Sequence, residues 1–114
     1  MNASMTLGTV PWGEPCAQLG MDGYATRALA ECGAYKAQLA RHFHEKHGRK
    51  LPEGVTLSVE GKEHEFGTYF EVHVNFDDDS EEAVKVAYWL EANSPEEWDE
   101  QARVSLGIPE PVYP

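Results

Sequence analysis

Two stretches of alternating apolar and polar residues organise this sequence: VTLSVE at residues 55–60 and YFEVHVNF at residues 69–76. Alternation with a period of two predicts β-strands that bury one face. The residues between them, 61–67, are mostly polar and include two glycines. Two such strands joined by a short polar turn predict an antiparallel β-hairpin. The side chains expected to face the core are Val55, Leu57, Val59, Phe70, Val72, Val74 and Phe76.

A long helix is expected before this hairpin. Asp22 is a suitable N-cap, and Gly48 is a suitable residue to follow the last turn. Between them, apolar residues recur at spacings of three and four, which is typical of an amphipathic helix. We expect Cys32 to be a small buried hydrophobe on this helix rather than a disulfide partner of Cys16. The expected buried stripe consists of Ala25, Ala28, Cys32, Tyr35, Leu39 and His42.

Two further helices are expected after the hairpin. Asp79 with Glu82 three residues later has the spacing of a capping box, which predicts a helix over 80–92. A second capping box with a proline at the first helical position opens another predicted helix over 94–107. Trp98 is expected to face inward from that helix.

These elements predict an α+β fold with a long N-terminal helix, an antiparallel hairpin and two C-terminal helices, in a single domain over 23–108. Residues 1–22 are rich in Gly and Pro and are expected to form an N-terminal arm, and residues 109–114 a Pro-rich tail. An isolated hairpin is marginally stable in water. Either Thr6–Val10 adds a third edge strand, or two copies of the chain join their hairpin edges in a homodimer.

The charge of the 114 residues is unevenly distributed, with a formal net charge of −11. Residues 1–52 carry six Lys or Arg and four Asp or Glu, a net of +2, whereas residues 53–114 carry three and sixteen, a net of −13. An acidic half repels phosphate backbones and attracts basic surfaces. It therefore disfavours direct nucleic-acid binding and predicts a basic protein partner, while a merely solubilising surface stays an alternative.

Some of these carboxylates have a structural explanation, because negative charge is favourable in the first turn of a helix. The first residues of the chain lack a basic region followed by an apolar run, and no apolar stretch reaches the roughly 18 residues that span a membrane. A cytoplasmic protein without membrane contact is the expectation. The candidate partner-binding residues are Asp77, Asp78, Glu91, Glu96, Glu97, Asp99 and Glu100.

Histidines near the end of the first helix are candidate metal ligands. Among His42, His44 and His47, only His44 and His47 lie on one helix face. Zinc accepts imidazole ligands in sets of three or four. The alternative is that these histidines simply favour the negative end of the helix dipole. A third ligand would come from one of three residues later in the chain: His64, Glu65 or His73.

Two other groups of polar residues merit attention. The run Asp77–Asp79 could bind a hard cation, although helix capping also explains it. The outer face of the second strand carries an aromatic and titratable residues that could form a binding surface or an acid–base pair, as well as an ordinary solvated sheet face. Its members are Tyr69, Glu71, His73 and Asn75. The sequence contains no nucleotide-binding or nucleophile-elbow motif, so we predict neither an enzyme nor a cofactor.

Two stretches, with the Tyr- and Ala-rich first helix, resemble small uncharacterised proteins of bacterial phages, plasmids and integrative elements. They are LGTVP at 7–11 with EPCAQLG at 14–20, and HEFGTYFEV at 64–72 running into Asp77–Asp79. The resemblance implies a mobile-element setting and no activity, cofactor or site residue. In such settings, small acidic proteins can block host enzymes by mimicking DNA, an analogy that rests on charge alone.

The sequence therefore predicts a non-catalytic accessory protein that binds a basic protein partner through its acidic C-terminal surface. A nucleic-acid-mimic inhibitor from a mobile element is one form of this prediction. Two alternatives stay open: a metal-binding protein that uses His44 and His47, and a small housekeeping adaptor.

Overall fold

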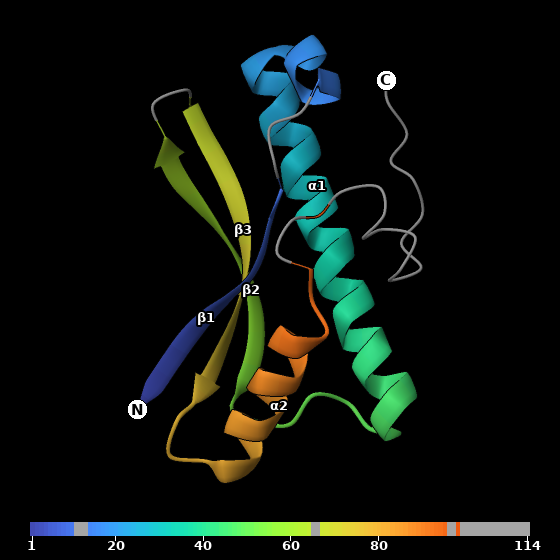
Figure 1. Cartoon of the computed structure of the whole chain (residues 1–114), viewed down its shortest axis with the longest axis vertical. Coiled ribbons are helices and arrows are strands. Elements are labelled where there is room, and N and C mark those ends of the chain that lie inside the picture. Colours follow the sequence, from blue (N-terminus) through green and yellow to red (C-terminus); the bar gives the residue numbers. More distant parts are fainter. Residues whose placement is uncertain (11–13, 65–66, 96–97, 99–114) are drawn as a thin grey trace.

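The computed structural model describes residues 1–10, 14–64, 67–95 and 98. Three strands and two helices lie within this part of the chain (Figure 1). In chain order they are β1 (Asn2–Val10), α1 (Glu14–His47), β2 (Val55–His64), β3 (Gly67–Asp77) and α2 (Glu81–Ala92).

The strands form one antiparallel sheet in the order β1-β3-β2. β2 and β3 are the predicted hairpin, with Leu57 opposite Val74, so this prediction is confirmed. Both strands continue further than expected, because their pairing extends to His64 and Gly67. β3 is consequently the middle strand, flanked on both sides over most of its length.

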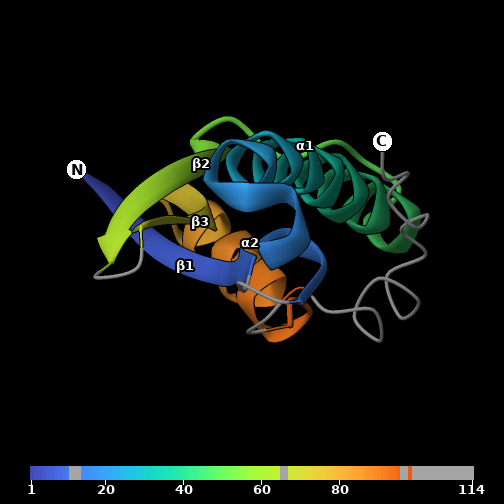
Figure 2. The same cartoon turned by 90° about the horizontal axis from the view of Figure 1, so that it is seen from above.

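Both helices cover the same face of the sheet (Figures 1 and 2). α1 packs on β2 and β3, and α2 packs on β1 and β3. The hairpin side chains that were predicted to face the core are buried or packed against it. The other face of the sheet has no helix over it in the described part of the chain (Figure 2).

The chain begins with a strand, so the predicted order with a long N-terminal helix first is wrong. Residues 2–10, which lie in the predicted N-terminal arm, pair with β3 as a third strand, so the alternative in which Thr6–Val10 adds an edge strand is confirmed and the strand begins earlier, at Asn2. A β-bulge hides this strand from a period-two pattern, because the pairing register shifts between Thr6 and Gly8 and leaves Leu7 as an extra residue. The shift places both Leu7 and Val10 in the core. The sheet thus reaches three strands within one chain.

α1 begins at Glu14, well before the predicted cap Asp22. Pro15 is tolerated there because the first N–H groups of a helix have no intrahelical partner. The predicted end of the helix is confirmed. Gly48 follows the last turn with a φ of 68° and donates its N–H to the carbonyl oxygen of His44 at 2.8 Å.

The buried face of α1 is largely the predicted stripe. Phe43, rather than His42, continues it at the C-terminal end. At 100° per residue these two positions lie about equally far from the centre of the stripe, and the apolar ring is the one that is buried. Burial also raises the pKa of the Cys32 thiol to about 12, as expected of a small buried hydrophobe. The fully buried members of the predicted stripe are Ala28, Cys32, Tyr35 and Leu39.

The N-cap of α2 is Ser80, so the prediction of Asp79 as the cap is wrong. Ser80 Oγ accepts the N–H of Ala83 at 3.2 Å. Asp79 lies one residue earlier, in a turn in which its own N–H donates to Asp77 Oδ1. Asn93 ends the helix, as predicted.

The segment after α2 returns to the outer edge of β1. The N–H of Trp98 donates to the carbonyl oxygen of Thr9 at 2.9 Å, and the buried indole stacks on Tyr35 with ring centroids 4.2 Å apart. The predicted inward position of Trp98 is confirmed. The described residues of 94–107 are not helical, and the rest of that predicted helix, like the tail over 109–114, lies outside the described residues.

Candidate functional site

A group of titratable side chains lies on the open face of the sheet. Glu71 and His73 are two residues apart on β3 and therefore project from the same face. Glu60 on β2 lies directly opposite Glu71. One ligand atom from each of the three residues lies within 4.8 Å of the other two. We call Glu60, Glu71 and His73 the sheet-face cluster.

The imidazole of His73 is the centre of this cluster. Its Nε2 atom lies 2.9 Å from Glu71 Oε1 and 3.2 Å from Glu60 Oε2. On the β1 side, Ser4 Oγ lies 3.3 Å from Nδ1 and Thr6 Oγ1 lies 3.5 Å from Nε2. All three strands thus contribute to the surroundings of one ring.

The cluster is buried at its centre and open at its rim. The exposed fraction of the side chain is 9% for His73 and 13% for Glu71 but 49% for Glu60. Lys62 approaches the open side, with Nζ 3.5 Å from Glu60 Oε2. An imidazole held between two carboxylates can exchange a proton with them or bind a cation together with them.

The sequence indicated this face only in part. Glu71 and His73 were expected to share it, and the structure brings them into contact. Asn75, from the same predicted face, instead donates a hydrogen bond to Ser58 Oγ at 2.9 Å. Tyr69 lies further along the hairpin, away from His73. The residues that sequence reasoning missed are Ser4, Thr6 and Glu60. The first two are placed only by the pairing of β1 with β3, which puts Thr6 opposite His73.

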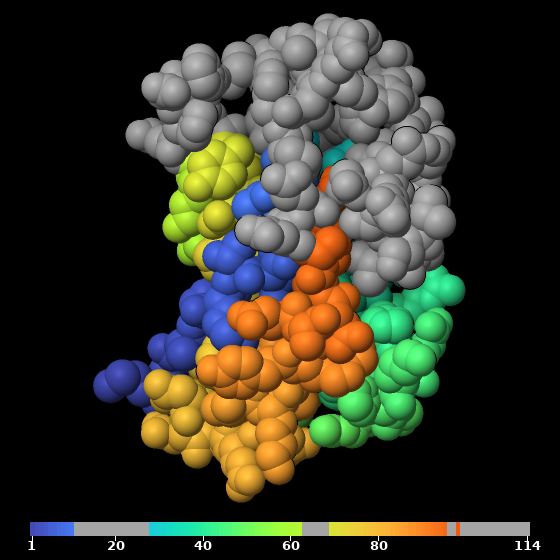
Figure 3. Space-filling model, viewed as in Figure 1, coloured from blue at the N-terminus to red at the C-terminus, as the bar shows by residue number. Residues whose placement is uncertain are grey.

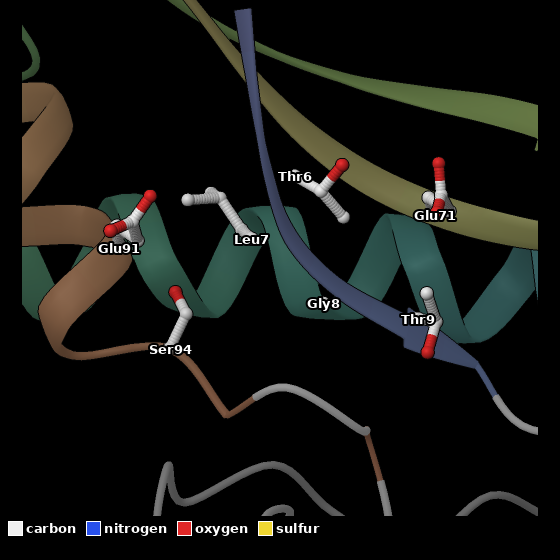
Figure 4. A pocket seen from close by; sticks show the side chains of 7 residues that line it. All are labelled: Thr6, Leu7, Gly8, Thr9, Glu71, Glu91 and Ser94. Carbon is white, nitrogen blue, oxygen red and sulfur yellow. The ribbon is translucent and has the colours of Figure 1, made fainter.

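A hollow of about 570 Å³ surrounds the outer edge of β1 near the C-terminal end of α2 (Figure 4). In Figure 4 the side chains of Thr6 and Glu71 lie on one side of the β1 ribbon, and those of Glu91 and Ser94 on the other. Two lining side chains are carboxylates and none of the described ones is basic. The lining residues are Thr6, Leu7, Gly8, Thr9, Glu71, Glu91 and Ser94.

The predicted partner-binding residues fall in different places. Asp77 and Asp78 lie at the turn before α2, whereas Glu91 lies near its end, about 15 Å further along at 1.5 Å per residue. Figure 3 shows the surface of α2 between β1 and the C-terminal end of α1. The other four, Glu96, Glu97, Asp99 and Glu100, lie outside the described residues.

The turn Asp77–Asp79 is balanced by a cation of the chain itself. The α-amino group of Met1 lies 2.7 Å from Asp79 Oδ2 and 3.6 Å from both Asp77 Oδ1 and Asp78 Oδ1. Its hydrogen bond to Asp79 raises the pKa of this amino group. The three carboxylates therefore have a partner without a bound metal ion.

His44 and His47 do not converge with a third ligand within the described part of the chain. His47 packs edge-on against Trp89, with ring centroids 4.8 Å apart, while His44 is exposed. His73 cannot join them because it lies on the sheet face opposite to α1. The side chains of residues 64–65 lie outside the described residues, so a metal site on α1 stays a prediction.

Comparisons with known proteins add no family or function: a scan of family models, a search of curated proteins and a search of solved structures each found no match. Within the described residues, neither helix combines the length and the apolarity that crossing a membrane requires.

Proposed function

We propose that this chain is a non-catalytic accessory protein that binds a basic protein partner through the acidic surface of α2, with the hollow at the β1 edge receiving a basic side chain. The observation that supports this proposal most directly is the position of Glu91. This residue, predicted to bind a partner, lines the hollow together with Glu71. A concave site with two carboxylates and no described basic lining residue attracts a cationic group.

The lining suits a lysine or an arginine side chain. On the α2 side of β1, the Glu91 carboxylate can accept charge-assisted hydrogen bonds and the Ser94 hydroxyl a further one, while Glu71 on the other side of β1 adds negative charge (Figure 4). The volume lies within the range of ordinary binding pockets, about 300–1,000 Å³.

The surface around the hollow extends this negative charge. Residues 77–92 contain six carboxylates and one lysine, a net of −5. Arg49 against Glu82 and the α-amino group of Met1 against Asp77–Asp79 offset two of these charges, and the negative charge that is left speeds the approach of a basic partner. Tyr88 is an exposed aromatic on this helix, and tyrosines often anchor protein interfaces.

A partner whose basic surface ordinarily contacts nucleic acid would meet the same requirements. Nucleic-acid mimicry is therefore a specific form of the proposal. A mobile-element origin and a homodimer are separate predictions. The sequence resemblance supports the first, and the outer edge of β2, which pairs with no other strand among the described residues, supports the second.

A titration with a tetra-arginine peptide, followed by amide chemical shifts, tests the proposal. We expect the largest shift changes at the residues that line the hollow, and we expect them to shrink as ionic strength rises. Glu91→Gln removes one charge at nearly constant size. Because a charge-assisted hydrogen bond is lost, we expect this variant to bind the peptide about tenfold more weakly.

The matched control is Glu45→Gln, which removes the same charge from an exposed position on α1. We expect its affinity for the peptide to equal that of the wild type. Equal weakening by Glu45→Gln and Glu91→Gln would mean that only net charge matters, and shift changes away from the hollow would contradict the site. Proteins captured from the native host are then compared between Glu91→Gln and the control variant, and the proposed partner is lost only from the first.

A further inference from the structure

We propose that the sheet-face cluster binds one divalent transition-metal ion of the zinc class, with Glu60, Glu71 and His73 as its protein ligands. One imidazole nitrogen and two carboxylate oxygens form a ligand set that zinc accepts. Magnesium and calcium prefer oxygen ligands alone. The site differs from the predicted histidine pair on α1, and Glu60 and His73 do not line the hollow at the β1 edge.

The distances within the cluster suit an ion of this size. Tetrahedral zinc with bonds of about 2.0–2.1 Å holds neighbouring ligand atoms about 3.4 Å apart. His73 Nε2 lies 2.9 Å from Glu71 Oε1 and 3.2 Å from Glu60 Oε2. The three ligand atoms lie within 4.8 Å of one another, so small side-chain rotations would place them around one ion. The exposed side of Glu60 leaves access for the ion and room for water as a fourth ligand.

The charges around the cluster also favour a cation. Glu60 and Glu71 face each other across β2 and β3, and like charges in directly opposite positions are destabilising. Among the described charged groups near them, Lys62 approaches Glu60 alone, and β1 contributes only neutral hydroxyls. A divalent ion between the carboxylates would neutralise both.

Ser4 supplies the orienting contact that metal-binding histidines usually have. Its hydroxyl lies 3.3 Å from His73 Nδ1. When Nδ1–H donates to Ser4 Oγ, the Nε2 lone pair points to the two carboxylates and can bind the ion. Without an ion, Nε2–H instead donates to Glu71. Metal binding thus selects the Nδ1–H tautomer, and Ser4 stabilises it.

Calorimetric titration of the purified chain with zinc chloride tests this site. We expect one Zn²⁺ per chain, with His73→Gln lowering the affinity by more than 100-fold because it removes the nitrogen ligand. Ser4→Ala lies at an exposed strand position and keeps all three ligands. We expect it to weaken binding about tenfold, as loss of an orienting partner does. His44→Gln, on α1, is the control that leaves the affinity unchanged.

Circular dichroism establishes whether each variant is folded. If His73→Gln unfolds, the zinc affinities of Ser4→Ala and Glu60→Gln, which change exposed positions, test the site instead. Absence of zinc binding by the wild type, or wild-type affinity in Ser4→Ala and Glu60→Gln, would overturn the proposal. Displacement of zinc by an equal concentration of magnesium would also overturn it, because an imidazole ligand discriminates against magnesium. Glu91→Gln is expected to bind zinc normally, so this test does not depend on the proposed partner.

Discussion

Replacement of Gly8 by alanine should destabilise the protein, because the backbone of β1 touches another segment there. A Cβ atom at this position would lie 2.5 Å from the carbonyl oxygen of Pro95, and 2.8 Å and 2.9 Å from Nε1 and Cε2 of Trp98. Movement of Trp98 away from the added methyl group would break its other contacts. Trp98 is buried, its backbone N–H donates to the carbonyl oxygen of Thr9, and its ring stacks on Tyr35.

The size of the effect follows from two bounds. Adding a methyl group to a packed core costs about 1–3 kcal/mol. Complete expulsion of the Trp98 ring would cost as much as a Trp→Ala change, about 3–5 kcal/mol. We therefore expect a loss of about 2 kcal/mol in the free energy of unfolding. In a domain of this size that loss corresponds to a decrease in Tm of about 8 °C.

Thermal and urea unfolding monitored by circular dichroism measure this loss, and Gly33→Ala is the matched control. Gly33 lies inside α1, and a Cβ atom there would meet no atom within 4 Å. Since alanine favours the helix over glycine, this second variant should gain about 1 kcal/mol. The reasoning is refuted if Gly8→Ala melts within 1–2 °C of the wild type, or if the two variants shift Tm in the same direction.

Two other changes test local features of the fold. Ser80→Ala removes the N-cap of α2 and should lower the free energy of unfolding in urea by about 1 kcal/mol. Asp79→Ala, at the position favoured by the sequence pattern, should lower it clearly less. Equal losses would contradict the cap assignment. In a Cys16→Ser background, Cys32 should react with a thiol reagent far more slowly in the folded chain than in urea. Because burial raises its pKa from 9.0 to about 12, its stabilising contribution is complete below pH 9 and is lost as the pH rises towards 12, which unfolding measured between these values checks.

Much of the core could be predicted from periodicity. The hairpin and its inward residues follow from alternation, and the stripe on α1 follows from spacings of three and four. Gly48 could be predicted because a left-handed residue commonly ends a helix. These features depend on local sequence alone, and the structure places them as expected.

The first strand could be predicted only in part, because Thr6–Val10 was one of two ways to complete the sheet and residues 2–5 were left in the arm. Its alternation changes phase at Leu7, so a period-two pattern covers only part of residues 2–10. The start of α1 is concealed too, because Pro15 and nearby glycines resemble loop residues although the first turn tolerates proline. The cap of α2 was misplaced by one residue because Asp79 and Ser80 both suit the position, and only the hydrogen bond to Ala83 distinguishes them.

The pairing of β1 with β3 changes the surroundings of the side chains on the outer face of β3. In an isolated hairpin, His73 would have a neighbouring strand on one side only, and its ring would be largely exposed to water. With β1 paired to the other side, Ser4 and Thr6 enclose the ring, and a histidine that points away from the core becomes 91% buried between two carboxylates. A buried imidazole beside carboxylates has few arrangements of low free energy, because every buried charge needs a partner. The strand that local sequence reasoning placed only in part is therefore also the one that turns an ordinary sheet face into a candidate binding site.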